Sequence, residues 1–163
     1  MTARQANPRR VLLDINVLFY DFLFRNPTYG SKTPATHELR NRKQSNNALI
    51  YSRQGRLFRT FVADFSIAKF ISLMQQVKAP KALQIDEVEN LLTKNEVVSL
   101  GSRLIKSILE ETKNKPLVKD MEDALQFVVA QNNRCTHIIT FNKTDFDPFD
   151  IGVVLPGKIR SIF

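Results

Sequence analysis

The chain has 163 residues, enough for one domain with a sizeable core, and its net charge of +8 favours a polyanionic partner. One cysteine, Cys135, excludes an internal disulfide and a cysteine-rich metal site, and with two histidines a histidine-based zinc site is not expected. No apolar run is long enough to span a bilayer, and the polar tail at residues 1–9 lacks the apolar core of a signal peptide, so we expect a single domain over residues 1–163 in the reducing cytoplasm.

The basic excess lies in the first part of the chain. Residues 1–60 hold eleven lysines and arginines against three acids, whereas residues 61–163 hold thirteen of each. A local excess of this kind favours binding to nucleic acid. The alternative is a solvated basic surface that aids solubility.

The first predicted elements are a short strand at residues 11–13 and a buried helix at residues 17–24, with Asn16 as the N-cap of the helix. Asp14 follows the strand directly. The carboxyl end of a strand is where ligands bind in open α/β sheets, so Asp14 is a candidate site residue. The alternative is that Asp14 only helps Asn16 to cap the helix.

Residues 26–45 contain Pro27, Gly30 and Pro34 and show no apolar period, so we expect a mobile basic loop inserted near the carboxyl edge of the sheet. Basic residues in this loop and around the next strand are the expected contacts for an RNA backbone: Arg40, Arg42, Lys43, Arg53, Arg56 and Arg59.

Helices and strands alternate through the rest of the chain. Helices are predicted at residues 46–54, 65–77, 85–94, 101–112 and 120–131, and strands at residues 57–63, 96–100, 137–141 and 153–155. Leu92, Ile105 and Leu109 are among the apolar residues expected to face the core. This alternation indicates an α/β fold with a mainly parallel sheet.

Three carboxylates fall at comparable places: Asp14 after the first strand, Asp123 in the first turn of a late helix, and Asp145 after the strand at residues 137–141. In a parallel sheet these places share one edge. Clustered carboxylates repel one another, and a hard divalent cation such as Mg²⁺ or Mn²⁺ relieves that repulsion. Alternatively, Asp123 only stabilises its helix dipole and Asp145 is a turn residue.

Three stretches together resemble the PIN domain, and most closely the VapC-like ribonucleases of toxin–antitoxin systems. They are Val-Leu-Leu-Asp-Ile-Asn-Val-Leu, Lys-Asp-Met-Glu-Asp-Ala-Leu-Gln-Phe and His-Ile-Ile-Thr-Phe-Asn-Lys-Thr-Asp-Phe. The resemblance spans residues 10 to about 156. It implies a three-layer α/β/α sandwich with a central parallel sheet, an acidic Mg²⁺ or Mn²⁺ site and cleavage of RNA. A small antitoxin protein and a homodimer are further implied partners.

By position, Asp14, Asp123 and Asp145 match the catalytic and metal-binding acids of that family. The supporting residues that the resemblance implies are Asn16, which orients the first acid, and Thr140 and Asn142, which support the site. Asp120 and Glu122 are further acids nearby that could hold a second metal or water.

One position departs from the family pattern. Lys69 stands where these proteins usually carry a glutamate, and its ammonium could occupy the space of a cation. Such a site would bind metal weakly or hold one ion, unless Asp64 or Glu122 compensates. The alternative is a shifted helix register in which Lys69 is merely solvated. Two functions follow as hypotheses: a metal-dependent endoribonuclease, or a degenerate PIN domain that binds RNA or protein without cutting.

Overall fold

The computed structural model describes residues 8–53, 58–114 and 120–162. In these ranges the chain forms a parallel sheet with the strand order β3-β2-β1-β4-β5. Its strands are β1 (Arg9–Leu13), β2 (Phe58–Ala63), β3 (Glu96–Val98), β4 (His137–Ile139) and β5 (Gly152–Val154).

The central strand, β1, is buried on both faces. Val11 and Leu13 point into the core on one side of the sheet, and Leu12 points into the core on the other. A strand covered on both faces is apolar at consecutive positions rather than at alternate ones, which explains the unbroken Val-Leu-Leu run. In register, Val11 pairs with Thr60 of β2 and with His137 of β4.

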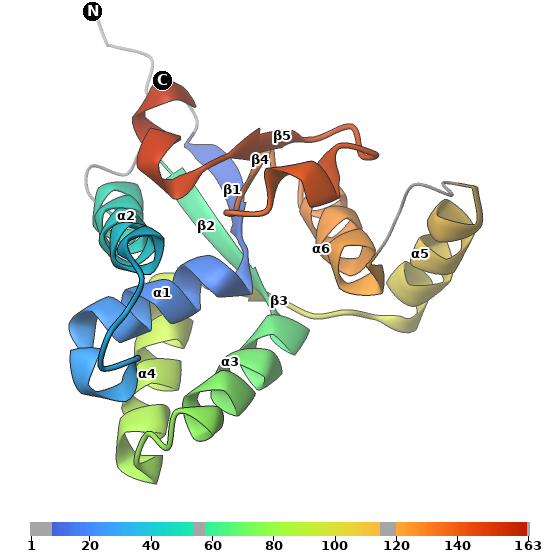
Figure 1. The fold of residues 1–163 in the computed structure, drawn as a ribbon. Coiled ribbons are helices and arrows are strands. Elements are labelled where there is room, and N and C mark those ends of the chain that lie inside the picture. Colours follow the sequence, from blue (N-terminus) through green and yellow to red (C-terminus); the bar gives the residue numbers. More distant parts are fainter. Residues whose placement is uncertain (1–7, 54–57, 115–119, 163) are drawn as a thin grey trace, which may run out of the picture.

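Helices cover both faces of the sheet, so the fold has three α/β/α layers, as predicted (Figure 1). One layer holds α1 (Ile15–Arg25), α2 (Thr36–Arg53), α3 (Asp64–Gln76), α4 (Lys81–Lys94) and the 3₁₀ helices η1 (Pro27–Tyr29) and η3 (Pro156–Ile162). The other holds α5 (Ser102–Asn114), α6 (Met121–Asn132) and the 3₁₀ helix η2 (Lys143–Phe146).

A polar network inside the first layer fixes the position of α1. The guanidinium of Arg25 donates to both carboxylate oxygens of Glu87 on α4, at 2.6 and 2.7 Å, and to Asp21 at 2.9 Å. Asn46 of α2 donates to the other oxygen of Asp21 at 2.9 Å. The side chains of Asp21 and Glu87 are buried, so their desolvation is offset by charge-assisted hydrogen bonds that tie three helices together.

The prediction of a loop over residues 26–45 is wrong beyond residue 35, because α2 begins at Thr36. This helix is polar around most of its circumference and buries few apolar side chains, Ala48 and Leu49 among them, so the sequence shows little helical apolar period. Arg42 is only 4% exposed, pairs with Glu38 one turn earlier and packs against Gly30.

Two smaller predictions are also corrected. Asp14, and not Asn16, is the residue that precedes α1, and Asn16 lies inside the first turn. Leu92, Ile105 and Leu109 do not face the core, since each is between 46% and 49% exposed. Apolar spacing locates a helix, but it does not give the width of the stripe that neighbouring elements cover.

No helix in the described ranges has both the length and the apolar character needed to cross a membrane.

Candidate active site

Asp14 stands where β1 ends and α1 begins, and its side chain is held from two other parts of the chain. Its backbone N–H donates to the carbonyl of Ile139 at 3.1 Å, which continues the pairing of β1 with β4. Thr140, directly after β4, donates its hydroxyl to Oδ2 of Asp14 at 2.6 Å, and Gln126 of α6 donates its amide to Oδ1 at 2.8 Å. Asp14 is only 4% exposed, and the two hydrogen bonds fix the orientation of its carboxyl group.

The hydroxyl of Thr140 uses its donor position and both of its acceptor positions. It accepts from the backbone N–H of Asn142 at 3.0 Å and from the side-chain amide of Asn16 at 3.4 Å. A hydroxyl has one donor and two acceptor positions, so its proton is left for Asp14. Asn16 and Asn142 therefore contact Asp14 indirectly, through Thr140.

A cavity of about 290 Å³ opens in front of Asp14 at the carboxyl edge of the sheet. All of the predicted acids line it: Asp14, Asp120, Glu122, Asp123 and Asp145. The other lining residues are Ile15, Asn16, Phe19, Tyr20, Lys69, Leu73, Gln126 and Asn142. The topology thus brings together acids from the end of β1, the start of α6 and η2, which lie far apart in the sequence.

The acids in this cavity repel one another. Burial raises the pKa of Asp14, and the charge of Glu122 adds to that rise, while hydrogen bonds from Thr140 and Gln126 oppose it. Burial and four neighbouring carboxylates raise the pKa of Asp123 to about 7. Those neighbours are Asp120, Asp145, Asp14 and Glu122. The cavity therefore favours cations, either protons or a metal.

Lys69 of α3 faces this cavity and forms an ion pair with Glu122 of α6. The side chain of Lys69 is 46% exposed, so it lines the cavity and is also in contact with solvent, and its correspondence to the glutamate of that family stays a prediction. Asp64 does not compensate for the missing glutamate, since its carboxylate accepts the backbone N–H groups of Phe65 and Leu100.

The chemistry of the donor set suits Mg²⁺ or Mn²⁺. Two buried amide oxygens beside the cavity, Oδ1 of Asn16 and Oε1 of Gln126, accept no hydrogen bond. Water molecules around a bound ion would donate hydrogen bonds to them. Among the described residues, however, no three Asp, Glu, His or Cys side chains are placed to bind one ion. A hydrated ion on one or two carboxylates, as is usual for Mg²⁺, fits this arrangement better than a closed cage.

The predicted RNA-binding residues do not line this cavity. Arg40 and Lys43 are exposed on α2, and Arg42 is buried. Arg59 pairs with Glu96, and it lies four residues before the end of β2, roughly 13 Å from the carboxyl edge at about 3.3 Å per residue. The side chains of Arg53 and Arg56 lie outside the described residues.

Sequence reasoning missed Gln126 and the aromatic wall of Phe19 and Tyr20. A signal for Gln126 existed, because it lies three residues after Asp123 and so on the same side of α6. For the aromatic residues the signal was weak, since any apolar residue of α1 could equally face the core.

Comparisons with known proteins agree on the fold. No protein-family model and no curated protein matches the sequence. Among solved structures, a toxin–antitoxin complex from Klebsiella pneumoniae is similar at 17% identity and a TM-score of 0.60, covering 90% of this chain and 97% of that one. VapBC2 from Rickettsia felis, bound to a DNA fragment from its promoter, is similar at 13% identity and a TM-score of 0.63, covering 90% and 98%.

A third similar structure is VapC20 from Mycobacterium tuberculosis, described as a sarcin-ricin loop cleaving toxin. It has 13% identity and a TM-score of 0.56, and the match covers 78% of this chain and 86% of that one. The chain has the VapC-like PIN-domain fold, which is the fold that the sequence resemblance implied.

Proposed function

We propose that this protein is a metal-dependent endoribonuclease and the toxin of a toxin–antitoxin pair. One observation carries the proposal: a buried carboxylate, Asp14, is oriented by Thr140 and Gln126 toward a cavity lined with four further acids. Five acids beside one ammonium, that of Lys69, lower the stability of the fold, so the cluster is best explained by a cation that the function requires.

In this proposal Asp14, Asp123 and Asp145 surround a hydrated Mg²⁺ or Mn²⁺, which one or two of them would bind directly and the others through water. When bound, the metal polarises the scissile phosphate and lowers the pKa of an attacking water. Thr140 and Gln126 keep the carboxylate of Asp14 in one orientation, with Asn16 acting through Thr140. Because a ligand must be deprotonated to bind metal, the raised pKa of Asp123 makes metal binding weaken as the pH falls below about 7.

A second candidate function is a non-cutting PIN domain that binds RNA or a protein. The ion pair between Lys69 and Glu122 favours it, because an ammonium already neutralises one acid at the cavity. The ammonium of Lys69 can stabilise the fold, but it cannot polarise a phosphate as a metal does. RNA cleavage would then be slow or absent.

Cleavage of labelled RNA decides between the two. The purified protein is incubated with RNA in Mn²⁺, in Mg²⁺ and in chelator, beside Asp14→Asn and the control Asp147→Asn, which removes an exposed acid outside the cavity. A nuclease cleaves only with metal, loses cleavage in Asp14→Asn and keeps it in Asp147→Asn. Cleavage by Asp14→Asn at the wild-type rate would eliminate the proposed mechanism, and no cleavage by the wild type under any metal condition would favour the binding module.

The toxin assignment implies a small antitoxin protein that covers the acid cavity, and a site of action in the cytoplasm. A small open reading frame directly beside this one, whose product copurifies with the chain and suppresses cleavage, is the expected result. If the neighbouring product does not bind, the nuclease assignment can stand while the toxin assignment falls.

A further inference from the structure

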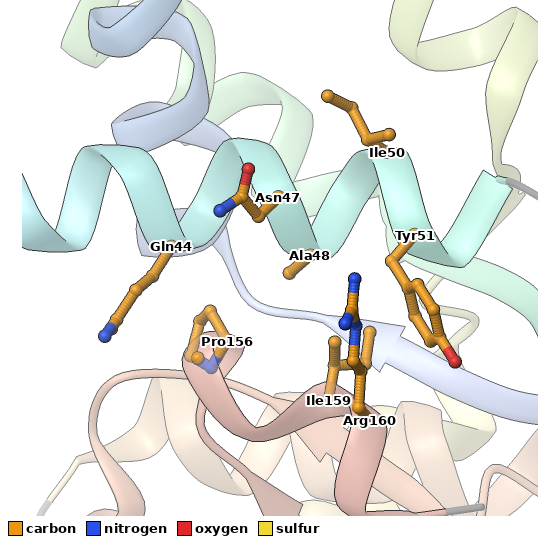
Figure 2. Close-up of a pocket in the computed structure, with 9 residues that line it drawn as sticks. Gln44, Asn47, Ala48, Ile50, Tyr51, Pro156, Ile159 and Arg160 are labelled. Atoms are coloured by element: carbon orange, nitrogen blue, oxygen red, sulfur yellow. The ribbon is translucent and has the colours of Figure 1, made fainter.

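A second cavity, of about 490 Å³, lies between α2 and η3 and shares no lining residue with the acid cavity. Figure 2 shows Gln44 and Tyr51 reaching from α2 toward Pro156 and Arg160 of η3. We call this cavity the α2–η3 groove. Its lining residues are Gln44, Asn47, Ala48, Ile50, Tyr51, Pro156, Gly157, Ile159 and Arg160.

The charge of the groove is positive. None of the nine described residues that line it is acidic, and Arg160 is basic. Exposed basic residues flank it on the same two elements: Arg40 and Lys43 on α2, and Lys158 on η3. Glu38, the acid of α2, is engaged by Arg42. This part of the surface therefore attracts anions.

Helical spacing arranges the α2 side of the groove as one stripe. Arg40, Gln44, Asn47 and Tyr51 follow one another at intervals of four, three and four residues, so they share a face of the helix. A cation, two amides and an aromatic ring thus lie in a row. Such a row can contact successive groups of an extended chain.

Arg160 is held in a defined position at this row. Its guanidinium carbon lies 5.2 Å from the centre of the Tyr51 ring, within the range of a cation–π contact. A guanidinium fixed in this way offers a flat surface for stacking and N–H groups for a phosphate. Across the groove, Gln44 packs against Gly157, where a Cβ atom would come within 2.8 Å of its carboxamide.

The chemistry matches a nucleotide in three respects. The guanidinium of Arg160 suits a phosphate or the face of a base, and the amides of Gln44 and Asn47 can donate to and accept from the edge of a base. The cavity volume lies within the range of small-molecule sites. A base that enters a cavity must be unstacked and unpaired, which favours a single strand over a duplex.

We propose that the α2–η3 groove binds a single-stranded nucleic-acid segment, with one nucleotide in the cavity against Arg160 and neighbouring phosphates on Arg40 and Lys43. This binding does not depend on cleavage at the acid cavity. In this proposal, part of the basic excess at residues 1–60 contributes to RNA binding through Arg40 and Lys43 on α2.

The test is fluorescence anisotropy with a short labelled single-stranded RNA, in chelator and at several salt concentrations. Arg160→Gln should bind about tenfold more weakly, which corresponds to about 1.4 kcal/mol, and should lower the salt slope by about 0.7. Arg160→Lys keeps the charge but loses the planar group, so its slope should stay while its affinity falls. The matched control is Arg103→Gln, an exposed arginine on α5 in the other layer, which should bind like the wild type.

Equal affinities of Arg160→Gln and Arg103→Gln would overturn the proposal, provided that both variants melt like the wild type. Equal binding of a duplex would overturn the preference for single strands. Displacement of the RNA by an acidic peptide of equal charge, as effectively as by unlabelled RNA, would assign the groove to a protein partner. The measurement is made in chelator, where no metal-dependent cleavage takes place, so a failure of the nuclease proposal leaves this result unaffected.

Discussion

Substitution of Asp123 by asparagine should stabilise the metal-free protein at neutral and alkaline pH. In the folded chain, burial and four neighbouring carboxylates raise the pKa of Asp123 from 3.8 to about 7. The folded protein therefore binds this proton more tightly than the unfolded chain does. Stability is lost as the pH rises from about 4 to about 7, and the whole penalty is present above that range.

The size of the effect follows from the same shift. A difference from 3.8 to about 7 is worth about 4 kcal/mol at 1.36 kcal/mol per pH unit. The cavity is open to water, which screens the charges, and asparagine gives up part of the helix-dipole stabilisation, so we expect a net gain of about 2 kcal/mol. The gain should be complete at about pH 8 and should vanish near pH 4.

Urea unfolding followed by far-ultraviolet circular dichroism measures this gain, since the chain has no tryptophan. Chelator is present throughout, and Asp86→Asn, an exposed acid on α4, serves as the control. A stability difference between Asp123→Asn and the wild type that is the same near pH 4 and near pH 8 would refute the repulsion argument. Added Mn²⁺ should then stabilise the wild type at about pH 8 more than it stabilises Asp123→Asn.

Three further predictions concern the remaining charged groups. Arg25→Met should lower the free energy of unfolding by about 3–5 kcal/mol in a urea titration, because two buried carboxylates lose their cation; a loss under about 1 kcal/mol would show that water replaces it. Lys69→Glu should bind Mn²⁺ more tightly than the wild type in a calorimetric titration, and equal affinities would show that the ammonium does not compete with metal. Arg42→Ala should destabilise the fold by about 2 kcal/mol and exposed Arg40→Ala by less than about 0.5 kcal/mol, with similar losses contradicting the burial of Arg42.

The sheet and the acids at its edge could be predicted because their signals are local. β1 and β4 each end in a short apolar run, which is followed at once by a polar residue, Asp14 or Thr140. Parallel pairing then places both polar residues at the same edge. No long-range contact had to be guessed for this step.

Other parts of the site depend on how helices that are distant in the sequence pack relative to one another. Lys69 and Glu122 are separated by 53 positions and belong to different layers, so no sequence pattern reveals their ion pair. Arg42 had a visible partner, since Glu38 lies four residues earlier, but this spacing supports a helix only when a helix is already expected. The polar composition of α2 hid that helix and with it the true position of the basic residues.

The strand order also sets when the site can exist during biosynthesis. β1 is made first but lies in the centre of the sheet, and its neighbour β4 belongs to the last part of the chain. Thr140 follows Asp14 by 126 positions and Gln126 follows it by 112, so a growing chain presents the carboxylate long before either donor has been synthesised. Contacts of this range close slowly, because most of the chain must first be ordered between them. The acid cavity is therefore among the last features to form, and a chain interrupted before β4 carries the acid without the site.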